Sequence, residues 1–183
     1  MIKIKPLFLT ALALSIVGCS FNYGDGEEDR NRPDIVMENI EYVRFRGGDP
    51  LVRFRAEYAE RWEERQIMEI RAFSFEQFDN DEISARGNAG TARVELVSGD
   101  VFLREGVTVS IESEDIVITT SELDWRDRDR NLSGPQNGEV KVERSDGTTF
   151  TGQGFIANTR TRVWEFTGEV SGTYVESENE ENS

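Results

Sequence analysis

Few residue types in this chain could do covalent chemistry. There is no histidine, so the commonest general base and the commonest protein metal ligand are both missing. The single cysteine allows neither an intrachain disulfide nor a cysteine-cluster zinc site. The 36 acidic residues could supply a carboxylate pair of the glycosidase kind, but no spacing singles out two of them. The sequence therefore predicts a protein that is not an enzyme and has no metal or cofactor. A carbohydrate-active enzyme is the least favoured alternative.

The charge of the chain limits its partners. A formal net charge of −15 argues against nucleic acid, because polyphosphate binding requires a basic surface. The basic residues are nearly all arginine, whose planar guanidinium suits phosphate as well as carboxylate groups. Pairing with glutamate across neighbouring strands is the favoured interpretation, and contact with a lipid phosphate is the alternative. The arginines that gather in the first half are Arg44, Arg46, Arg53, Arg55, Arg61, Arg65 and Arg71.

The only cysteine, Cys19, closes an apolar segment near the N-terminus. Lys3 and Lys5 precede the apolar run 7–17, which is too short to cross a bilayer as a helix. The run ends in Ile-Val-Gly-Cys, which resembles the lipobox of bacterial lipoproteins. This resemblance implies that the peptide is cut before Cys19 and that Cys19 carries a membrane-anchoring lipid. A plain secretory peptide with an incidental cysteine is the alternative.

Composition divides the chain into four parts. Residues 1–18 are the predicted signal peptide, and residues 19–33, which are polar and acidic after the cysteine, are a predicted flexible tether. One folded domain is predicted over residues 34–175, a length that can bury a core. Residues 176–183 are acidic, lack aliphatic side chains and form a predicted disordered tail.

The stretch 91–118 shows the fold class most clearly. Its apolar positions recur at period two, many are β-branched, and glycines interrupt them. This pattern is typical of antiparallel strands that bury one face and expose the other. Further extended segments are predicted at 35–45, 51–56, 67–75, 83–92, 107–111, 116–119, 122–125, 140–142, 148–150, 155–157, 163–166 and 170–174. The sequence predicts an all-β, open antiparallel structure.

Two local features qualify this pattern. Residues 56–66 favour a helix by propensity, with Tyr58 and Trp62 one helical turn apart, but their place in a weak repeat predicts strand–turn–strand. In that repeat a Gly-acid-Val motif begins at residues 99, 138 and 168. Such recurrence suggests stacked two-strand units, which bury their apolar faces only against one another.

An ordered set of degenerate motifs resembles a known family. The motifs are NIEY at 39–42, LVRFRAEYAE at 51–60, VELVSGDV at 94–101, SELDW at 121–125, TGQGFIAN at 151–158 and FTGEVSG at 166–172. In this order they resemble the periplasmic lipopolysaccharide-export proteins of the LptC type, and the wider group that includes LptA. The resemblance covers nearly all of residues 35–174. Familiar members are held by a transmembrane helix, so the predicted lipid anchor is a departure.

The resemblance implies a single antiparallel β-jellyroll, folded like a slit tube, that carries lipid acyl chains inside. Such a protein would accept lipopolysaccharide or a related glycolipid from the permeases of an inner-membrane ABC transporter and pass it to an LptA-like periplasmic protein. It would act in the periplasm at a membrane surface. The inner membrane is favoured by this function, and the outer membrane is the alternative. The strongly acidic composition leaves the lipid headgroup open.

Two sets of site residues follow from the resemblance and the alternation. The expected lipid-groove residues are Phe54, Ile70, Val94, Leu96, Phe102, Val109, Ile111, Ile118, Trp125, Val140, Phe150, Phe155, Trp164 and Phe166. The expected partner edges carry Ile40, Tyr42, Val43, Val163, Val170 and Tyr174, because a free strand edge can pair with a neighbouring protein. The alternative is a surface lipoprotein whose apolar side chains fill a closed β-sandwich, serving as a structural or adhesive module.

Overall fold

The computed structural model describes residues 32–176. The predicted signal peptide, Cys19, nearly all of the tether and nearly all of the tail lie outside these residues. The described strands belong to one compact unit. Within residues 32–176, no helix is long and apolar enough to cross a bilayer.

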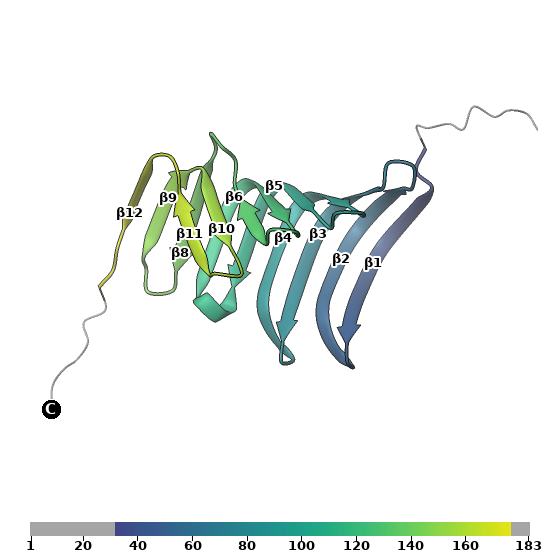
Figure 1. Ribbon diagram of the computed structural model, residues 1–183, viewed down its shortest axis with the longest axis horizontal. Coiled ribbons are helices and arrows are strands. Elements are labelled where there is room, and N and C mark those ends of the chain that lie inside the picture. The colour runs from purple at the N-terminus through teal and green to yellow at the C-terminus, as the bar shows by residue number, and fades with distance from the viewer. Residues whose placement is uncertain (1–31, 177–183) are drawn as a thin grey trace, which may run out of the picture. The chain divides into compact units, whose positions relative to one another are not determined.

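The described residues form one 12-stranded antiparallel sheet (Figure 1). Its elements are β1 (Ile35–Arg46), β2 (Asp49–Trp62), β3 (Ile67–Asp79), β4 (Glu82–Glu95), β5 (Val101–Ile111), η2 (Glu112–Glu114), β6 (Ile116–Arg126), β7 (Asn131–Ser133), β8 (Glu139–Arg144), β9 (Thr149–Gln153), β10 (Phe155–Asn158), β11 (Val163–Phe166) and β12 (Val170–Thr173). In the described part of the chain the one helical element is the single turn η2. The predicted all-β antiparallel fold is confirmed.

The sheet divides at β6. Strands β1 to β6 pair in chain order, but the far edge of β6 has two partners. Its C-terminal half pairs with β7, which leads to β10 and β11, and its N-terminal half pairs with β8, which leads to β9 and β12. In Figure 1, β10 and β11 lie in front of β8 and β9. The sheet therefore ends as two separate branches that lie one over the other.

A crease crosses the long strands and continues this division. Positive φ angles occur at Asn39 in β1, Ala72 in β3, Glu105 and Gly106 in β5, and Gly154 between β9 and β10. Glu105 and Gly106 lie at a register shift of β5 against both β4 and β6, where they form a bulge that bends the strand. Asn39 and Ala72 leave the register of their strand pairs unchanged, but Ile70 and Phe73, three residues apart around Ala72, are both buried, so the inward face changes phase there. The crease therefore folds each long strand so that its two halves lie in different parts of the sheet.

The crease creates two leaves with facing apolar surfaces. Leaf one contains β7, β10, β11 and one half of each long strand, and leaf two contains β8, β9, β12 and the other halves. Cross-strand pairing aligns side chains into rows within each leaf. One leaf-one row is Met37, Ala59, Ile70, Ala92, Leu103 and Leu123, and one leaf-two row is Tyr42, Phe54, Phe75, Gly87, Val109, Ile118, Val142, Phe150 and Gly172. Buried residues of both leaves form one core cluster.

Strain at the crease can be tested at Ala72, which has φ of 51° although it carries a Cβ. An L-residue in this region costs roughly 1–2 kcal/mol, and glycine removes that cost at some loss of chain entropy. We expect Ala72→Gly to stabilise the domain by about 0.5–1 kcal/mol in urea unfolding. Ala92→Gly, at a regularly paired position of β4, is the control and should destabilise by about 0.5–1 kcal/mol. A loss of stability in both variants would contradict a strained crease.

The structure answers the predictions for residues 56–66 and for the Gly-acid-Val motif. The segment 56–66 is strand to Trp62, a turn, and strand again from Ile67, as predicted. The three Gly-acid-Val motifs each precede or open a strand, at β5, β8 and β12. They fall on different leaves, because β5 begins in leaf one whereas β8 and β12 belong to leaf two. The motif therefore marks strand starts rather than equivalent repeat units.

Candidate functional site

An apolar groove lies between the two leaves. Its cavity has a volume of about 380 Å³, within the usual range of roughly 300–1,000 Å³ for small-molecule sites. Leaf two contributes Ala85, Ile111, Ile116, Ile118 and Val142, and leaf one contributes Phe155, Ala157 and Trp164. The mouth is polar, with Gln77, Asp79, Ser84, Ser113, Glu114, Asn158, Thr159 and Arg162. This arrangement suits an amphiphile with its chains inside and its head at the surface.

Small side chains explain why this space is open. Ala85 pairs with Ile111 in leaf two, and Ala157 pairs with Leu132 and Trp164 in leaf one. Where larger side chains meet, the leaves close. Phe150 of leaf two lies 5.8 Å from Trp164 of leaf one between ring centroids. A Cβ on Gly152 would lie 2.9 Å from the Phe166 ring, so these strands meet at a position that only glycine fits.

The predicted groove residues fall into three groups. Ile111, Ile118, Phe155 and Trp164 line the groove. Ile70, Val109 and Val140 lie in the buried core, and Phe54, Val94 and Phe166 are partly buried against it. Trp125 shares a leaf-one row with Leu132, and Phe150 contacts Trp164. Contact of any of these residues with lipid stays a prediction.

Phe102 and Leu96 are corrections to the expected groove. Phe102 lies on the outer face of β5, because its neighbours Val101 and Leu103 face the core and adjacent strand residues point in opposite directions. Its ring packs against Arg126, whose guanidinium carbon lies 4.8 Å from the ring centroid. Leu96 follows the end of β4 and belongs to the turn before β5, outside the core cluster.

Sequence reasoning did not select the two alanines or the polar residues of the mouth. Ala157 could have been found, because period two from Phe155 places it on the same face. Its small size is what leaves room, whereas hydrophobic patterning points first to large apolar side chains. Thr159 and Arg162 lie in a hairpin turn, where strand alternation gives no signal.

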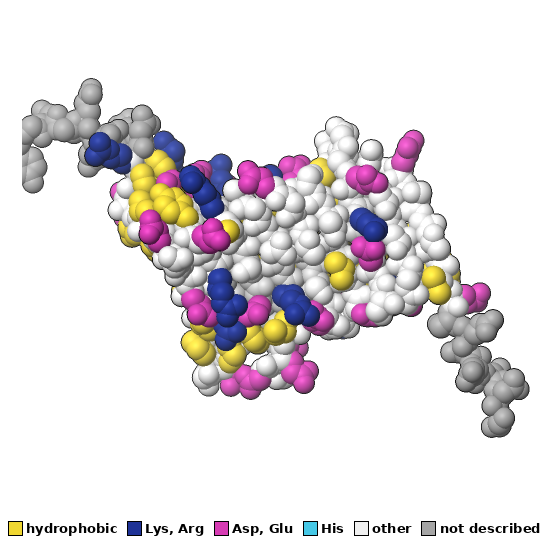
Figure 2. All heavy atoms as spheres, turned by 180° about the vertical axis from the view of Figure 1, so that it is seen from behind, with side chains coloured by type: hydrophobic (Ala, Val, Ile, Leu, Met, Phe, Trp, Pro, Cys, Tyr) yellow, Lys and Arg dark blue, Asp and Glu magenta, His cyan; other side chains and the backbone are white. Residues whose placement is uncertain are grey.

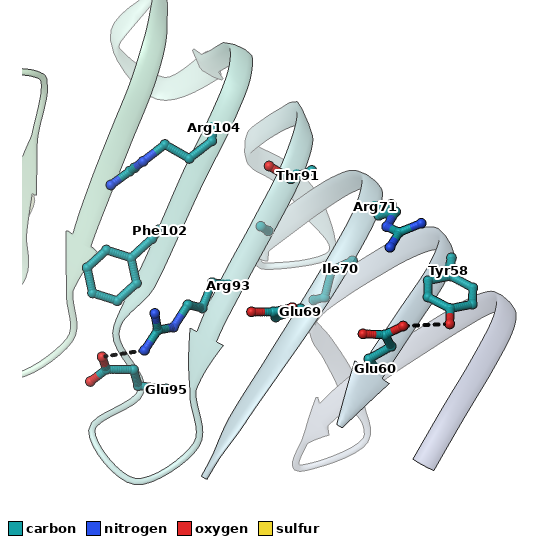
Figure 3. A pocket seen from close by; sticks show the side chains of 11 residues that line it. Tyr58, Glu60, Glu69, Ile70, Arg71, Thr91, Arg93, Glu95, Phe102 and Arg104 are labelled. Atoms are coloured by element: carbon teal, nitrogen blue, oxygen red, sulfur yellow. Dashed lines mark hydrogen bonds and ion pairs between the residues drawn. The ribbon is translucent and has the colours of Figure 1, made fainter. Parts of the chain in front are cut away.

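A second hollow, of about 420 Å³, lies on the outer face of leaf one (Figure 3). Its side chains alternate along β2 to β5 with the buried core residues, and they are mostly charged. Tyr58 donates a hydrogen bond to Glu60 at 2.7 Å, and Arg93 pairs with Glu95 at 3.9 Å. Arg71 stacks on Tyr58 with its guanidinium carbon 4.9 Å from the ring centroid. This polar hollow is separate from the groove and offers little apolar surface to an acyl chain.

Arginine–glutamate pairs cover the outer face of leaf two. Arg53 and Arg55 share Glu41 and Glu76 at distances from 3.0 to 3.8 Å. The Arg53 Nε is 3.5 Å from Glu41 but lacks hydrogen-bond geometry, so it is a charge contact only. The favoured interpretation of cross-strand pairing is therefore correct for these two arginines. Within residues 32–176, no group of three or more acidic, cysteine or histidine side chains is placed to hold a metal ion.

Asp100 joins two turns at the end of leaf one. Its carboxylate accepts hydrogen bonds from Arg126 Nη1 at 2.9 Å and from the Asp127 backbone N–H at 3.0 Å. The hydrogen bond from Arg126, followed by that from Asp127, lowers the pKa of Asp100 below its ordinary value of 3.8. The ionised carboxylate therefore stabilises the folded state.

This linkage predicts a pH-dependent loss of stability in Asp100→Asn. Because the folded-state pKa is lowered, the stabilisation is complete above the unfolded-state pKa and is lost as pH falls through the folded-state pKa. We expect the variant to have a lower melting temperature than the wild type near neutral pH, with the gap closing below a pH of about 4. Circular dichroism melts across this range measure the gap. Asp129→Asn in the adjacent turn is the control, and a gap that persists unchanged in acid would refute the assignment.

The sheet ends in unpaired edges. In the described part of the chain β1 pairs only with β2, and β11 and β12 each pair with a single strand. Ile40, Tyr42 and Val43 lie on β1, Val163 lies on β11 and Val170 lies on β12, at the expected edges; Tyr174 follows the end of β12. Figure 2 shows apolar side chains gathered at the β1–β2 end of the domain, and Val36, Tyr42 and Phe45 of β1 are exposed. Their use by partners stays a prediction.

Comparison with known proteins identifies a family that matches the chain and a solved structure with a similar fold. Residues 8–175 match the model of a family described as lipopolysaccharide-assembly, LptC-related. Among solved structures, the fold is similar to LptH from Pseudomonas aeruginosa, described as the LptA-homologous periplasmic component of the conserved lipopolysaccharide transport device. The two chains are 12% identical with a TM-score of 0.55, over 68% of this chain and 95% of LptH, so the likeness shows the fold alone. A search of curated proteins found no match.

Proposed function

This chain belongs to the LptC-related family of lipopolysaccharide-assembly proteins, and we propose that it carries the acyl chains of lipopolysaccharide, or of a related glycolipid, in the groove between its leaves. The groove supports this proposal because it joins an apolar interior to a polar mouth. Each methylene withdrawn from water contributes about 0.8 kcal/mol, so a multi-chain lipid needs such cover to cross an aqueous space. The protein is therefore a carrier in the periplasm and not an enzyme.

The anchor and the direction of transfer complete the proposal. A lipid on Cys19 holds the protein at the inner membrane, and the tether gives the domain reach to a transporter. The domain accepts lipid from the permeases of an ABC transporter and passes it to an LptA-like protein. Mass spectrometry of intact protein extracted from its native membrane tests this directly. We expect an acylated Cys19 and a copurifying glycolipid, whereas an unmodified cysteine or a lipid-free domain would refute the respective part.

The free edges supply the docking surfaces. β1 spans both leaves and offers a long unpaired edge to the transporter, and β11 with β12 offers the opposite edges to the LptA-like protein. Strand addition at such edges satisfies backbone groups that are otherwise left to solvent.

We expect a photocrosslinking residue at Tyr42 to capture transporter subunits and one at Val163 to capture the LptA-like protein in living cells. Both side chains are exposed, at 47% and 60%. A probe at Thr119, exposed on the outer face of the central strand β6, is the control and should capture neither. Capture of the same protein from both edges, or equal capture from Thr119, would contradict the assignment of edges.

A further inference from the structure

The hairpin between β10 and β11 places one arginine at the mouth of the groove and carries a second arginine two residues before it. Arg162 lines the mouth together with Thr159, and Arg160 lies in the same turn. Both arginines are exposed, and within residues 32–176 neither forms an ion pair with a carboxylate. We call Arg160 and Arg162 the arginine lip.

The arginine lip differs from several arginines of the domain that are paired. The chain has 36 acidic residues, and three of these pairs illustrate the difference. Arg86 pairs with Glu112 at 2.9 Å, Arg104 with Asp124 at 2.6 Å, and Arg130, in the turn beside the hairpin, with Asp127 at 3.0 Å. The lip thus holds two guanidinium groups whose hydrogen-bond donors are available to a ligand.

Hydrogen bonds of the Asn158 side chain stabilise the hairpin that carries the arginine lip. The Asn158 Nδ2 donates to Asn131 Oδ1 at 2.7 Å, and its Oδ1 accepts from the backbone N–H groups of Arg160 and Thr161, each at 3.0 Å. The Thr159 backbone N–H also donates to the Arg130 carbonyl at 3.0 Å. A turn that is already ordered loses little further entropy when it binds, so the arginine backbone is held in place for a ligand.

The opposite side of the mouth carries negative charge. Asp79 at the end of β3 and Glu114 in η2 line the groove from leaf two. An anionic group at the mouth would be repelled by these carboxylates and attracted by the arginine lip. The charge pattern therefore directs an anionic headgroup to the leaf-one side, with the apolar surface of Trp164 and Ala157 directly inside.

We propose that Arg160 and Arg162 bind the phosphate of an amphiphile whose acyl chain occupies the groove. Guanidinium groups form paired, charge-assisted hydrogen bonds with phosphate oxygens, which supplies orientation as well as affinity. This inference rests on the proposed function and specifies the headgroup chemistry that the groove selects.

The test compares three probes on the full-length protein by native mass spectrometry from detergent. Myristoyl lysophosphatidate carries the chain and the phosphate, monomyristoylglycerol carries the chain alone, and glycerol phosphate carries the phosphate alone. We expect the wild type to prefer the lysophosphatidate over monomyristoylglycerol by about tenfold, and to bind glycerol phosphate weakly. The double variant Arg160→Gln/Arg162→Gln should lose this preference and keep its affinity for monomyristoylglycerol.

A matched control removes the same charge elsewhere. Arg46 and Arg128 are exposed, and within the described residues they too lack an ion pair and do not line the groove. The double variant Arg46→Gln/Arg128→Gln should keep the wild-type preference, and an equal loss would overturn the lip as a site. Equal binding of both lipids by the wild type would also overturn it while leaving the groove intact. Failure of both lipids to bind would refute the groove as a lipid-binding site. Tight binding of glycerol phosphate would show that the arginine lip binds a soluble phosphate compound and not a lipid headgroup.

Discussion

Replacing Ala157 by tryptophan is expected to empty the groove of lipid while the domain remains folded. Ala157 faces Ile111 and Ile116 across a cavity of about 380 Å³, and an indole at this position would occupy the space proposed for acyl chains. We expect the amount of copurifying glycolipid to fall by more than about tenfold, because the cavity would no longer bury the chain. Quantitative lipid mass spectrometry of protein from cell membranes measures the change.

The neighbouring residue provides the control for this substitution. Ile156 lies on the outer face of β10 and is 38% exposed, so Ile156→Trp adds the same bulk outside the groove. It should leave the lipid content unchanged. Melting temperatures of both variants separate blocking from unfolding. A full lipid load in a folded Ala157→Trp protein would show that the groove is not the lipid site.

The second large effect is expected at Phe155, which belongs to the buried core as well as lining the groove. It is 1% exposed, and its ring centroid lies 5.6 Å from that of Phe166 and 6.3 Å from that of Trp164. Phe155→Ala should lower the free energy of unfolding by about 3–5 kcal/mol, since the surrounding core cannot fully close over the space of the lost ring. Urea unfolding followed by circular dichroism measures this loss.

Ile156→Ala, one residue further along β10, is the matched control and should change the free energy of unfolding by no more than about 0.5–1 kcal/mol. A loss below about 1 kcal/mol in Phe155→Ala would mean that the ring is not packed as described. Phe155 would then be a removable part of the groove wall, as the sequence alone suggested. The two substitutions at Phe155 and Ala157 thus separate a residue that packs the core from a residue that leaves space for a ligand.

Alternation at period two correctly predicted the strand class but not the length of the strands. The crease shifts the phase in β3, where Ile70 and Phe73 are three residues apart and are both buried, one on either side of Ala72. A pattern that changes phase looks like two short strands with a break. For this reason the single strand β6 was predicted as two segments, at 116–119 and 122–125.

The same phase shift explains the ambiguity of residues 56–66. Ala56 and Ala59 both face the core across the crease, a spacing of three that also occurs on a helix face. At Phe102 the alternation was regular and was not followed. Strict alternation with Val101 and Leu103 places Phe102 on the outer face, but its large aromatic side chain was assigned to the interior. Hydrophobicity selected the core well, whereas the open part of the groove depends on small and polar residues that hydrophobicity cannot rank.

The most direct test places a photocrosslinking residue at Ile111 in one protein and at Ser110 in another. The two positions are adjacent in β5, and their side chains point to opposite faces, Ile111 into the groove and Ser110 to the outer surface. Irradiation of cells followed by detection of lipopolysaccharide adducts should give a strong signal from Ile111 and none above background from Ser110. Equal labelling of both positions, or labelling of Ile111 by protein alone, would contradict transport of lipid between the leaves.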